Sequence, residues 1–423
     1  MTVKRLELEC FRSAERVAFG EDFVFDSRMN IFYGDNGAGK STILDALSLA
    51  LSWLPAKIRT LSGVGAGIKE SDIRNNEFSS GISVIVAHDG KEYAWMFRKV
   101  RKGVALAPEK SDYSGASELA KGFVSAGYLN GKGLPVLVSY PVTRAVLDIP
   151  LKIRNKHQFE PFNAYDEAFS GAANFRVFFE WFRNREDIEN QTARDNGGVI
   201  LKDRQLDAVR RAIEAFLPDI KDLRIMREPS LHMQAMKRGN PLRVDQLSDG
   251  EKCLLAMVGD LARRLAIANS VTESDPLNGE GVVLIDEIDL HLHPSWQRDV
   301  VPQLLNTFPN CQFFLSTHSP LVLNNVHPGN LFLVRESDGR MNISRPRASF
   351  GKSVVRVLED VMGLESSIPD SVASPLRDIF NAIAANNLEE ARRCISELKG
   401  RGFEDPELTR AEVLIRRREV LGK

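Results

Sequence analysis

The stretch Ile31–Leu47, IFYGDNGAGKSTILDAL, joins an apolar run, a glycine-rich turn and a second apolar run with a different period. Met29–Tyr33 has the pattern of a short strand, and the apolar residues of Ile43–Leu51 fall on one helical face. Between them, Gly34–Ser41 fits GxxxxGK[ST], whose glycines let successive backbone N–H groups curve around a phosphate. The stretch therefore predicts a strand, a phosphate-binding loop and a helix.

The side chains of this loop, the P-loop, predict how a nucleotide is held. Lys40 would reach the terminal phosphates, and the Ser41 hydroxyl would be a ligand of Mg²⁺. The other expected contacts with the nucleotide are Gly34, Asn36, Gly37, Gly39 and Thr42. A chance glycine-rich turn is the alternative, but the flanking strand and helix are the context that the motif requires.

Two carboxylates follow a second apolar strand. Asp286 and Glu287 come directly after the apolar strand Val282–Ile285. A helical pattern, Pro294–Asn306, then leads to another strand at Gln312–Ser316. This βαβ order predicts a parallel sheet. If the sheet brings them beside the P-loop, Asp286 would hold Mg²⁺ through water and Glu287 would orient or deprotonate the attacking water. A strand that merely ends at an acidic turn is the alternative.

The segment Leu247–Glu251, LSDGE, opens a long helical pattern that runs to Ala268. A serine, a glycine without a side chain and the positive end of a helix together form a second anion site. The alternative is an ordinary helix cap by Ser248 or Asp249. Both can hold, because a cap and a phosphate compete for the same N–H groups.

Four motifs, GDNGAGKST, LSDGE, VVLIDE and STHSP, occur in the order of the ABC-type ATPases and resemble the SMC/RecF-like branch of that AAA-related group. The resemblance implies an α/β head with a β-rich N-terminal lobe, a parallel-sheet P-loop core, a mainly helical insertion and a C-terminal helical tail. It implies ATP and Mg²⁺ as ligands and a head-to-tail dimer that encloses two ATP molecules. In such a dimer Ser248, Gly250 and Glu251 of one copy act on the nucleotide of the other.

Two further residues take their roles from the same resemblance. His318 in STHSP matches the switch histidine near the γ-phosphate, and Asp289 stands where the D-loop acid is expected. The chain also departs from the pattern twice. LSDGE replaces LSGGE, so Asp249 adds a carboxylate near a polyanion, and the strand exit Tyr140–Arg144 lacks the expected Q-loop glutamine.

The organisation expected from these motifs has four parts. The first two are an N-terminal lobe with the P-loop (1–140) and a mainly helical insertion or lid (141–222). The third is a C-terminal lobe (223–350) with the LSDGE segment, here called the signature, the strand that precedes the two carboxylates, and the switch histidine. The fourth is a helical tail that is a candidate for partner docking (351–423). Alternation predicts strands at Leu6–Cys10 and Phe23–Phe25, and a hairpin over Ile82–Arg98. Residues 100–133 are assigned no fold.

Several features have both a structural and a functional reading. His291 and His293 lie near Asp286 in the sequence and could be metal ligands, yet they also fit a helix cap or a position at the dimer interface. The aromatic stripe in Phe175–Phe182 favours a helix core over a base-stacking platform. The clusters Arg392–Arg393 and Arg416–Arg418 are typical of solvated helix faces, and a nucleic-acid contact stays open.

Composition favours a globular protein of the cytoplasm. Of the 423 residues, 43% are hydrophobic and 27% charged, with a formal net charge of −1, which argues against a surface that is polycationic throughout. The four cysteines are far apart with no metal-binding spacing, as in a reducing compartment. No apolar run reaches the length of a membrane span, so no membrane contact is expected.

The tail gives the functional expectation. FGKSVVRVLEDVMG and ELTRAEVLIRRREVLGK resemble the end of ATPases classed with the PtuA component of Septu-type antiphage systems, some of which accompany retrons. That resemblance implies a separate effector, an HNH nuclease, as the partner of an ATPase that dimerises around Mg-ATP. A higher oligomer is left open. The alternatives are a RecF-like repair ATPase and a scaffold that binds ATP without hydrolysing it.

Overall fold

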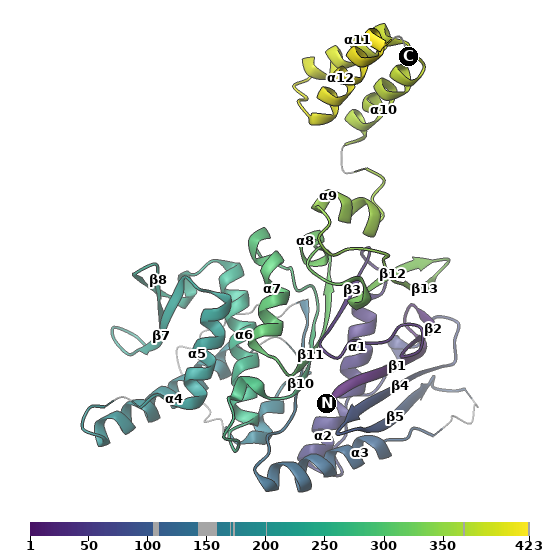
Figure 1. The fold of residues 1–423 in the computed structure, drawn as a ribbon. Coiled ribbons are helices and arrows are strands. Elements are labelled where there is room, and N and C mark those ends of the chain that lie inside the picture. The colour runs from purple at the N-terminus through teal and green to yellow at the C-terminus, as the bar shows by residue number, and fades with distance from the viewer. Residues whose placement is uncertain are drawn as a thin grey trace. The chain divides into compact units, whose positions relative to one another are not determined.

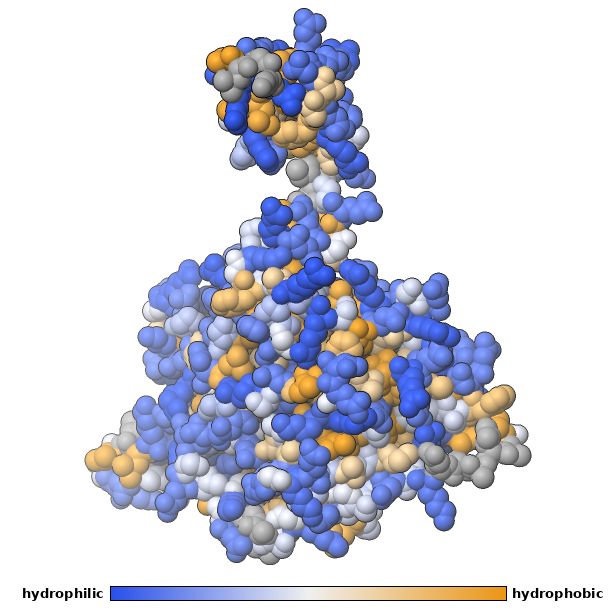
Figure 2. Space-filling model, turned by 45° about the vertical axis from the view of Figure 1, so that its right-hand side comes forward, coloured by the Kyte–Doolittle hydropathy of each residue, from blue (hydrophilic) through white to orange (hydrophobic). Residues whose placement is uncertain are grey.

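The chain folds into two compact units, Met1–Lys352 and Ser353–Lys423, in a computed structural model. The structure describes residues 1–104, 110–142, 159–169, 171, 174–199, 201–366 and 369–421. No helix in these ranges is long and apolar enough to cross a membrane. The face drawn in Figure 2 is mostly hydrophilic, with apolar residues in small groups.

A six-stranded sheet forms the centre of the first unit, in the order β13-β12-β3-β11-β10-β6 (Figure 1). Its strands are β3 (Met29–Tyr33), β6 (Val136–Tyr140), β10 (Gly281–Ile285), β11 (Cys311–Thr317), β12 (Leu331–Ser337) and β13 (Arg340–Ser344). All neighbours are parallel except β12 and β13. Every residue of β3, β10 and β11 is buried, as in sheets covered on both faces.

The predicted βαβ unit is confirmed, because α7 (Pro294–Thr307) connects β10 to its parallel neighbour β11. The short helix α8 (Pro320–Leu323) follows β11. Parallel strands end at the same edge of a sheet, so the residues after β3, β10 and β11 meet there. This edge carries the candidate site.

A second, antiparallel sheet has the order β2-β1-β4-β5, formed by β1 (Thr2–Phe11), β2 (Ala14–Phe19), β4 (Ser79–His88) and β5 (Lys91–Val100). The pairing of β4 with β5 confirms the predicted hairpin. The strand predicted at Phe23–Phe25 is wrong, because this segment is an irregular loop. Phe25 is buried there by stacking on Phe19, with ring centroids 5.0 Å apart, so its apolar character serves packing and not a ladder.

Helix α1 (Lys40–Leu51) packs against strands of both sheets and is followed by α2 (Trp53–Arg59). Ile43, Leu47 and Leu51 are completely buried, which confirms the predicted helical face. Residues 100–133, for which the sequence predicts no fold, contain α3 (Ser114–Lys121), which packs on α2 and β5. The helix that starts at the P-loop therefore lies in the core between the two sheets.

The rest of this unit is helical, with a small sheet. It comprises α4 (Phe175–Asp195), α5 (Arg204–Phe216), α6 (Asp249–Ala268) and the three-stranded sheet β7 (Ile220–Met226), β8 (His232–Lys237) and β9 (Asn240–Arg243). The aromatic stripe of α4 is confirmed as core, because Phe175, Phe178 and Phe182 are at most 1% exposed. Helix α6, which begins in the LSDGE signature, is buried along nearly its whole length.

The second unit contains the helices α9 (Val354–Arg356), α10 (Asp370–Ala384), α11 (Leu388–Gly400) and α12 (Pro406–Leu421). Helices α10, α11 and α12 confirm the expected helical tail. They enclose their own core, in which Ile379, Leu398 and Ala411 are at most 1% exposed. Arg392 pairs with Glu419 and Arg393 with Glu390, each at 2.6 Å, as on a solvated helix face.

A buried ion network connects the end of β6 to α6. The Asp260 carboxylate accepts hydrogen bonds from Arg263 (2.6 Å), Arg264 (2.7 Å) and the Tyr140 hydroxyl (2.9 Å). Arg264 also donates to the Ala164 carbonyl at 2.6 Å, which ties in the turn before α4. Burial acts to raise the pKa of Asp260, but the charges of Arg264 and Arg263 outweigh it and hold that pKa at about 2.

Replacing Asp260 by Asn should therefore destabilise the first unit strongly. The change leaves two buried guanidinium groups without a counter-charge, which costs about 3–5 kcal/mol. Because the pKa in the folded state lies below the unfolded value of about 3.9, the carboxylate stabilises the wild type above that pH and this contribution fades toward pH 2. Urea unfolding of both proteins between pH 3 and pH 7 measures the difference.

The surface pair of Asp219 with Arg238 supplies the control. These side chains are 51% and 74% exposed, so Asp219→Asn should change the unfolding free energy by less than about 1 kcal/mol. Equal losses for the two variants would contradict the role given to the buried network.

Candidate active site

The P-loop has a backbone that only glycine fits at two points. Gly34 has φ +146°, and a β-carbon there would lie 2.0 Å from the Val334 carbonyl oxygen. Gly39 has φ +107°, and its β-carbon would meet Met341 at 2.2 Å. Helix α1 begins directly after Gly39 without a capping side chain. The first N–H groups of α1 are therefore available to donate hydrogen bonds to an anion.

Lys40 keeps the loop curved. Its ammonium is buried, with 6% of the residue exposed, and donates to the carbonyls of Gly34 at 3.0 Å and Asp35 at 2.8 Å. Burial lowers the pKa of Lys40, against the charges of Asp286 and Glu287, which act to raise it. Asn36, Gly37 and Ser41 are exposed at the same loop, whereas Thr42 is buried. The ammonium thus points into the concave side of the loop, where a phosphate would sit.

The structure brings together Ser41 and Asp286, which are 245 residues apart in the sequence. The Ser41 hydroxyl donates to Asp286 Oδ2 at 2.8 Å. The Ser41 hydroxyl and the Asp286 carboxylate are two hard oxygen ligands next to the P-loop. They fit Mg²⁺, which is commonly held by one or two protein oxygens together with water and substrate phosphates. Among the described residues, no group of three or more His, Cys, Asp or Glu side chains forms a separate metal site.

Glu287 follows Asp286 in an unusual backbone conformation, with φ +47°. Its N–H donates to the Ser316 hydroxyl at 2.7 Å, and that hydroxyl in turn donates to Asp286. The Asp286 N–H donates to the Tyr140 carbonyl at 2.9 Å. Strands β6 and β11 therefore hold both carboxylate residues from either side of β10.

Asp289 and His318 are neighbours. The Asp289 carboxylate accepts from the Thr317 hydroxyl at 2.6 Å and from the His318 N–H at 3.3 Å. His318 itself is half-buried at the end of β11, at the same sheet edge as the P-loop. Within one chain, Asp289 thus fixes the segment that carries His318.

The signature forms a second cluster. Ser248 caps α6 and shares a capping box with Glu251, whose carboxylate accepts from the Ser248 N–H at 2.9 Å and from its hydroxyl at 2.8 Å. Lys237 of β8 pairs with Glu251 at 2.7 Å. Burial acts to raise the pKa of Glu251, but the hydrogen bonds from Lys237 and Ser248 lower it. The capping alternative is therefore confirmed for Ser248.

Gly250 and Asp249 lie differently in this cluster. A β-carbon on Gly250 would come within 2.5 Å of the His291 carbonyl oxygen, so glycine is required where α6 meets the loop after β10. Asp249 is 85% exposed in its side chain and lies 3.4 Å from Lys252. Ser248 is exposed too. The signature therefore faces outward from its own chain.

The HLHP segment leads into α7, and the Q-loop position lies at the exit of β6. His293 caps α7, with Nδ1 accepting from the Ser295 N–H at 3.3 Å, which confirms the capping interpretation for this histidine. At the strand exit, Tyr140 is buried and engaged by Asp260. Thr143 and Arg144 lie outside the described residues.

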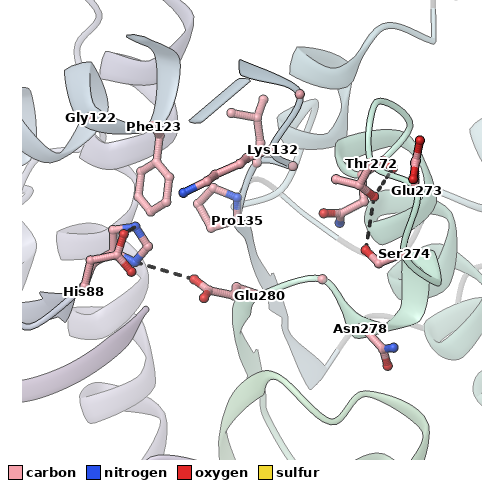
Figure 3. A pocket seen from close by; sticks show the side chains of 16 residues that line it. His88, Gly122, Phe123, Lys132, Pro135, Thr272, Glu273, Ser274, Asn278 and Glu280 are labelled. Atoms are coloured by element: carbon pink, nitrogen blue, oxygen red, sulfur yellow. Dashed lines mark hydrogen bonds and ion pairs between the residues drawn. The ribbon is translucent and has the colours of Figure 1, made fainter. Parts of the chain in front are cut away.

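A hollow of about 370 Å³ lies at the opposite edge of the sheet (Figure 3). It adjoins Pro135 and Glu280, the residues before β6 and β10, whereas the P-loop follows the end of β3. His88 points at Glu280 across it, with Nδ1 3.6 Å from the carboxylate. This hollow is separate from the candidate site.

Sequence reasoning missed the residues that support the site from elsewhere in the chain. Ser316 and Thr317 stand beside His318 in a quoted motif, and two hydroxyls at the end of a buried strand were a usable signal. No sequence signal pointed to Lys237 or Asp260, because only the fold brings Lys237 to Glu251 and Asp260 to Tyr140.

Comparison with known proteins places this chain among ATPases. Residues 5–221 match the family model described as "AAA domain", and residues 137–324 match "AAA domain, putative AbiEii toxin, Type IV TA system". The retron Ec83 probable ATPase of Escherichia coli is 30% identical over 93% of this chain and 82% of its own length. The retron Vc95 probable ATPase of Vibrio cholerae serotype O1 biovar El Tor is 33% identical, over 82% and 76%.

A Septu protein PtuA of Bacillus mycoides is 25% identical over 80% of this chain and 41% of its own length. The resemblance to AAA-related ATPases and to Septu and retron proteins is thus confirmed, as is the α/β fold class.

Proposed function

This chain is a member of the AAA-domain ATPase family, alongside the retron probable ATPases, and we propose that it binds and hydrolyses Mg-ATP to control a partner protein. One observation carries the proposal. Asp286 is held between Ser41 of the P-loop and Ser316 of β11, with Glu287 next to it. A carboxylate pair supported in this way at a phosphate loop is suited to phosphoryl transfer to water.

Each residue has a role in this reaction. The P-loop N–H groups and Lys40 bind the phosphates, and the oxygens of Ser41 and Asp286 would hold Mg²⁺, which when bound neutralises charge on the β- and γ-phosphates. Glu287 orients the attacking water and accepts its proton. His318 lies at the same sheet edge to contact the γ-phosphate, and Asp289 positions it.

The second half of the site would come from another copy of the chain. Ser248 is exposed at the N-terminus of α6, so its hydroxyl and the helix end can meet the γ-phosphate of a facing copy. In that encounter the hydroxyl leaves the Glu251 carboxylate, and the phosphate becomes its acceptor. A head-to-tail pair would enclose two ATP molecules, and loss of the γ-phosphate would let the two copies separate.

The partner is proposed from the relatives. Their names place them in retrons and Septu systems. The proposed role in antiphage defence, with a separate HNH nuclease as effector, follows from the resemblance of the tail to PtuA-type ATPases. The unit Ser353–Lys423 has its own core and is the proposed docking unit. ATP turnover measured for the chain alone, with DNA, and with the candidate effector tests the whole proposal. A chain that binds ATP but never turns it over would favour the scaffold alternative.

Lys237→Ala should weaken pairing of the two copies without affecting the P-loop. The ammonium offsets the Glu251 charge at 2.7 Å, and without it that carboxylate would repel the arriving triphosphate. We expect the ATP concentration needed for dimer formation to rise by about tenfold. Sedimentation velocity across an ATP titration, with the Glu287→Gln background to prevent turnover, measures the shift.

Lys221→Ala is the matched control, because Lys221 lies on the neighbouring strand β7 with an exposed side chain. It should leave the titration unchanged. Identical curves for Lys237→Ala and the wild type would contradict the role of Lys237.

A further inference from the structure

Ser316 lies at the centre of the candidate site, yet no role was assigned to it from the motifs. It is completely buried near the end of β11. Its hydroxyl donates to Asp286 Oδ1 and accepts the Glu287 N–H at 2.7 Å. A serine hydroxyl has one proton to donate, and here that proton goes to the Asp286 carboxylate.

The other half of Asp286 is fixed as well. Oδ2 accepts from Ser41 at 2.8 Å, and the backbone N–H donates to the Tyr140 carbonyl at 2.9 Å. Rotation of the carboxylate would break the bonds from Ser41 and Ser316 together. The plane of the carboxylate, and so the direction it offers a metal ion, depends on both hydroxyls.

Ser316 also holds the backbone that directs Glu287. The left-handed conformation at Glu287, with φ +47°, costs a non-glycine residue roughly 1–2 kcal/mol. It is held on one side by the Ser316 hydroxyl and on the other by the Ser316 carbonyl, which accepts from the Ile288 N–H at 3.0 Å. Loss of the hydroxyl would free the turn to relax and would re-aim the Glu287 side chain.

We propose that Ser316 is a positioning residue that sets the metal-facing carboxylate of Asp286 and the direction of Glu287 at the same time. This inference rests on the proposed Mg-ATP function. Residues that orient metal ligands commonly change metal affinity or activity by 10- to 100-fold when they are removed.

The test measures Mn²⁺ binding to the full chain in the presence of a non-hydrolysable ATP analogue, with electron paramagnetic resonance as the method of detection. Ser316→Ala should weaken Mn²⁺ binding by about 10- to 100-fold. Affinity for the analogue without metal should stay unchanged, since Lys40 and the loop are intact. Ser316→Thr keeps the hydroxyl and should retain most of the Mn²⁺ affinity.

Ser80→Ala is the control for loss of a buried serine hydroxyl. Ser80 is 1% exposed on β4 and donates to the Glu9 carbonyl at 3.1 Å, so its removal should leave Mn²⁺ binding at the wild-type level. Should Ser316→Ala fail to fold, Ser316→Cys keeps the side-chain size with a weak donor and should still weaken Mn²⁺ binding.

Wild-type Mn²⁺ affinity in Ser316→Ala, or in Ser316→Cys if only that variant folds, would overturn the inference, as would an equal loss in Ser80→Ala. The two proposals fail separately. If the wild type never turns over ATP but Ser316→Ala still weakens Mn²⁺ binding, hydrolysis is refuted and the positioning role stands.

Discussion

Glu287→Gln is expected to lose ATP turnover by about 10²- to 10⁴-fold while it still binds ATP. Gln keeps the size of the side chain but cannot accept a proton from the attacking water. The P-loop, Lys40 and the Ser41–Asp286 pair are untouched, so nucleotide affinity should change little. Phosphate release and equilibrium binding of a fluorescent ATP analogue measure the two quantities.

The same variant should accumulate as a dimer when ATP is present, because the γ-phosphate that joins the copies is no longer removed. Glu273→Gln is the matched control, since Glu273 is an exposed carboxylate beside the hollow at the opposite sheet edge. It should hydrolyse ATP at the wild-type rate. Undiminished phosphate release by Glu287→Gln would remove Glu287 from the reaction.

Lys40→Ala is expected to abolish nucleotide binding, with at least a 100-fold loss of affinity, because a charge-assisted contact to the phosphates disappears from a buried position. The variant should still fold. Its lost hydrogen bonds go to the Gly34 and Asp35 carbonyls of the same loop, and each, coming from a charged donor, is worth about 1.5–3 kcal/mol.

Thermal unfolding with and without ATP separates these effects, since a ligand that does not bind the folded protein does not stabilise it. ATP should raise the melting temperature of the wild type and leave that of Lys40→Ala unchanged. Lys57→Ala is the control, because Lys57 lies on α2 and donates to the Leu61 carbonyl on the surface. Wild-type ATP stabilisation of Lys40→Ala would contradict the P-loop assignment.

Much of the fold was predictable where the signal is local. The period of Ile43–Leu51 defines a helical face, and Val282–Ile285 with Pro294–Asn306 defines a βαβ unit, since both patterns lie within a few dozen residues. Phe25 misled the strand prediction because burial by ring stacking and burial in a ladder leave the same apolar letters.

The candidate site was predictable residue by residue but not as an arrangement. Motifs indicated Lys40, Asp286 and Glu287, whereas their bonds to Ser316 and Tyr140 depend on the order in which β6, β10 and β11 lie side by side. Strand order is set by packing over the whole chain, and no short pattern encodes it. The pairing of Lys237 with Glu251 was hidden for the same reason.

The composite site shared by two copies is tested most directly by mixing two inactive variants. Lys40→Ala removes the P-loop contact, and Ser248→Arg places a bulky cation at the exposed signature. A mixed dimer holds one intact site, built from the P-loop of the Ser248→Arg chain and the signature of the Lys40→Ala chain. Each variant alone should be inactive, and an equal mixture should recover about a quarter of the wild-type turnover. A mixture as inactive as its components, or wild-type turnover by Ser248→Arg alone, would contradict a site shared between two copies.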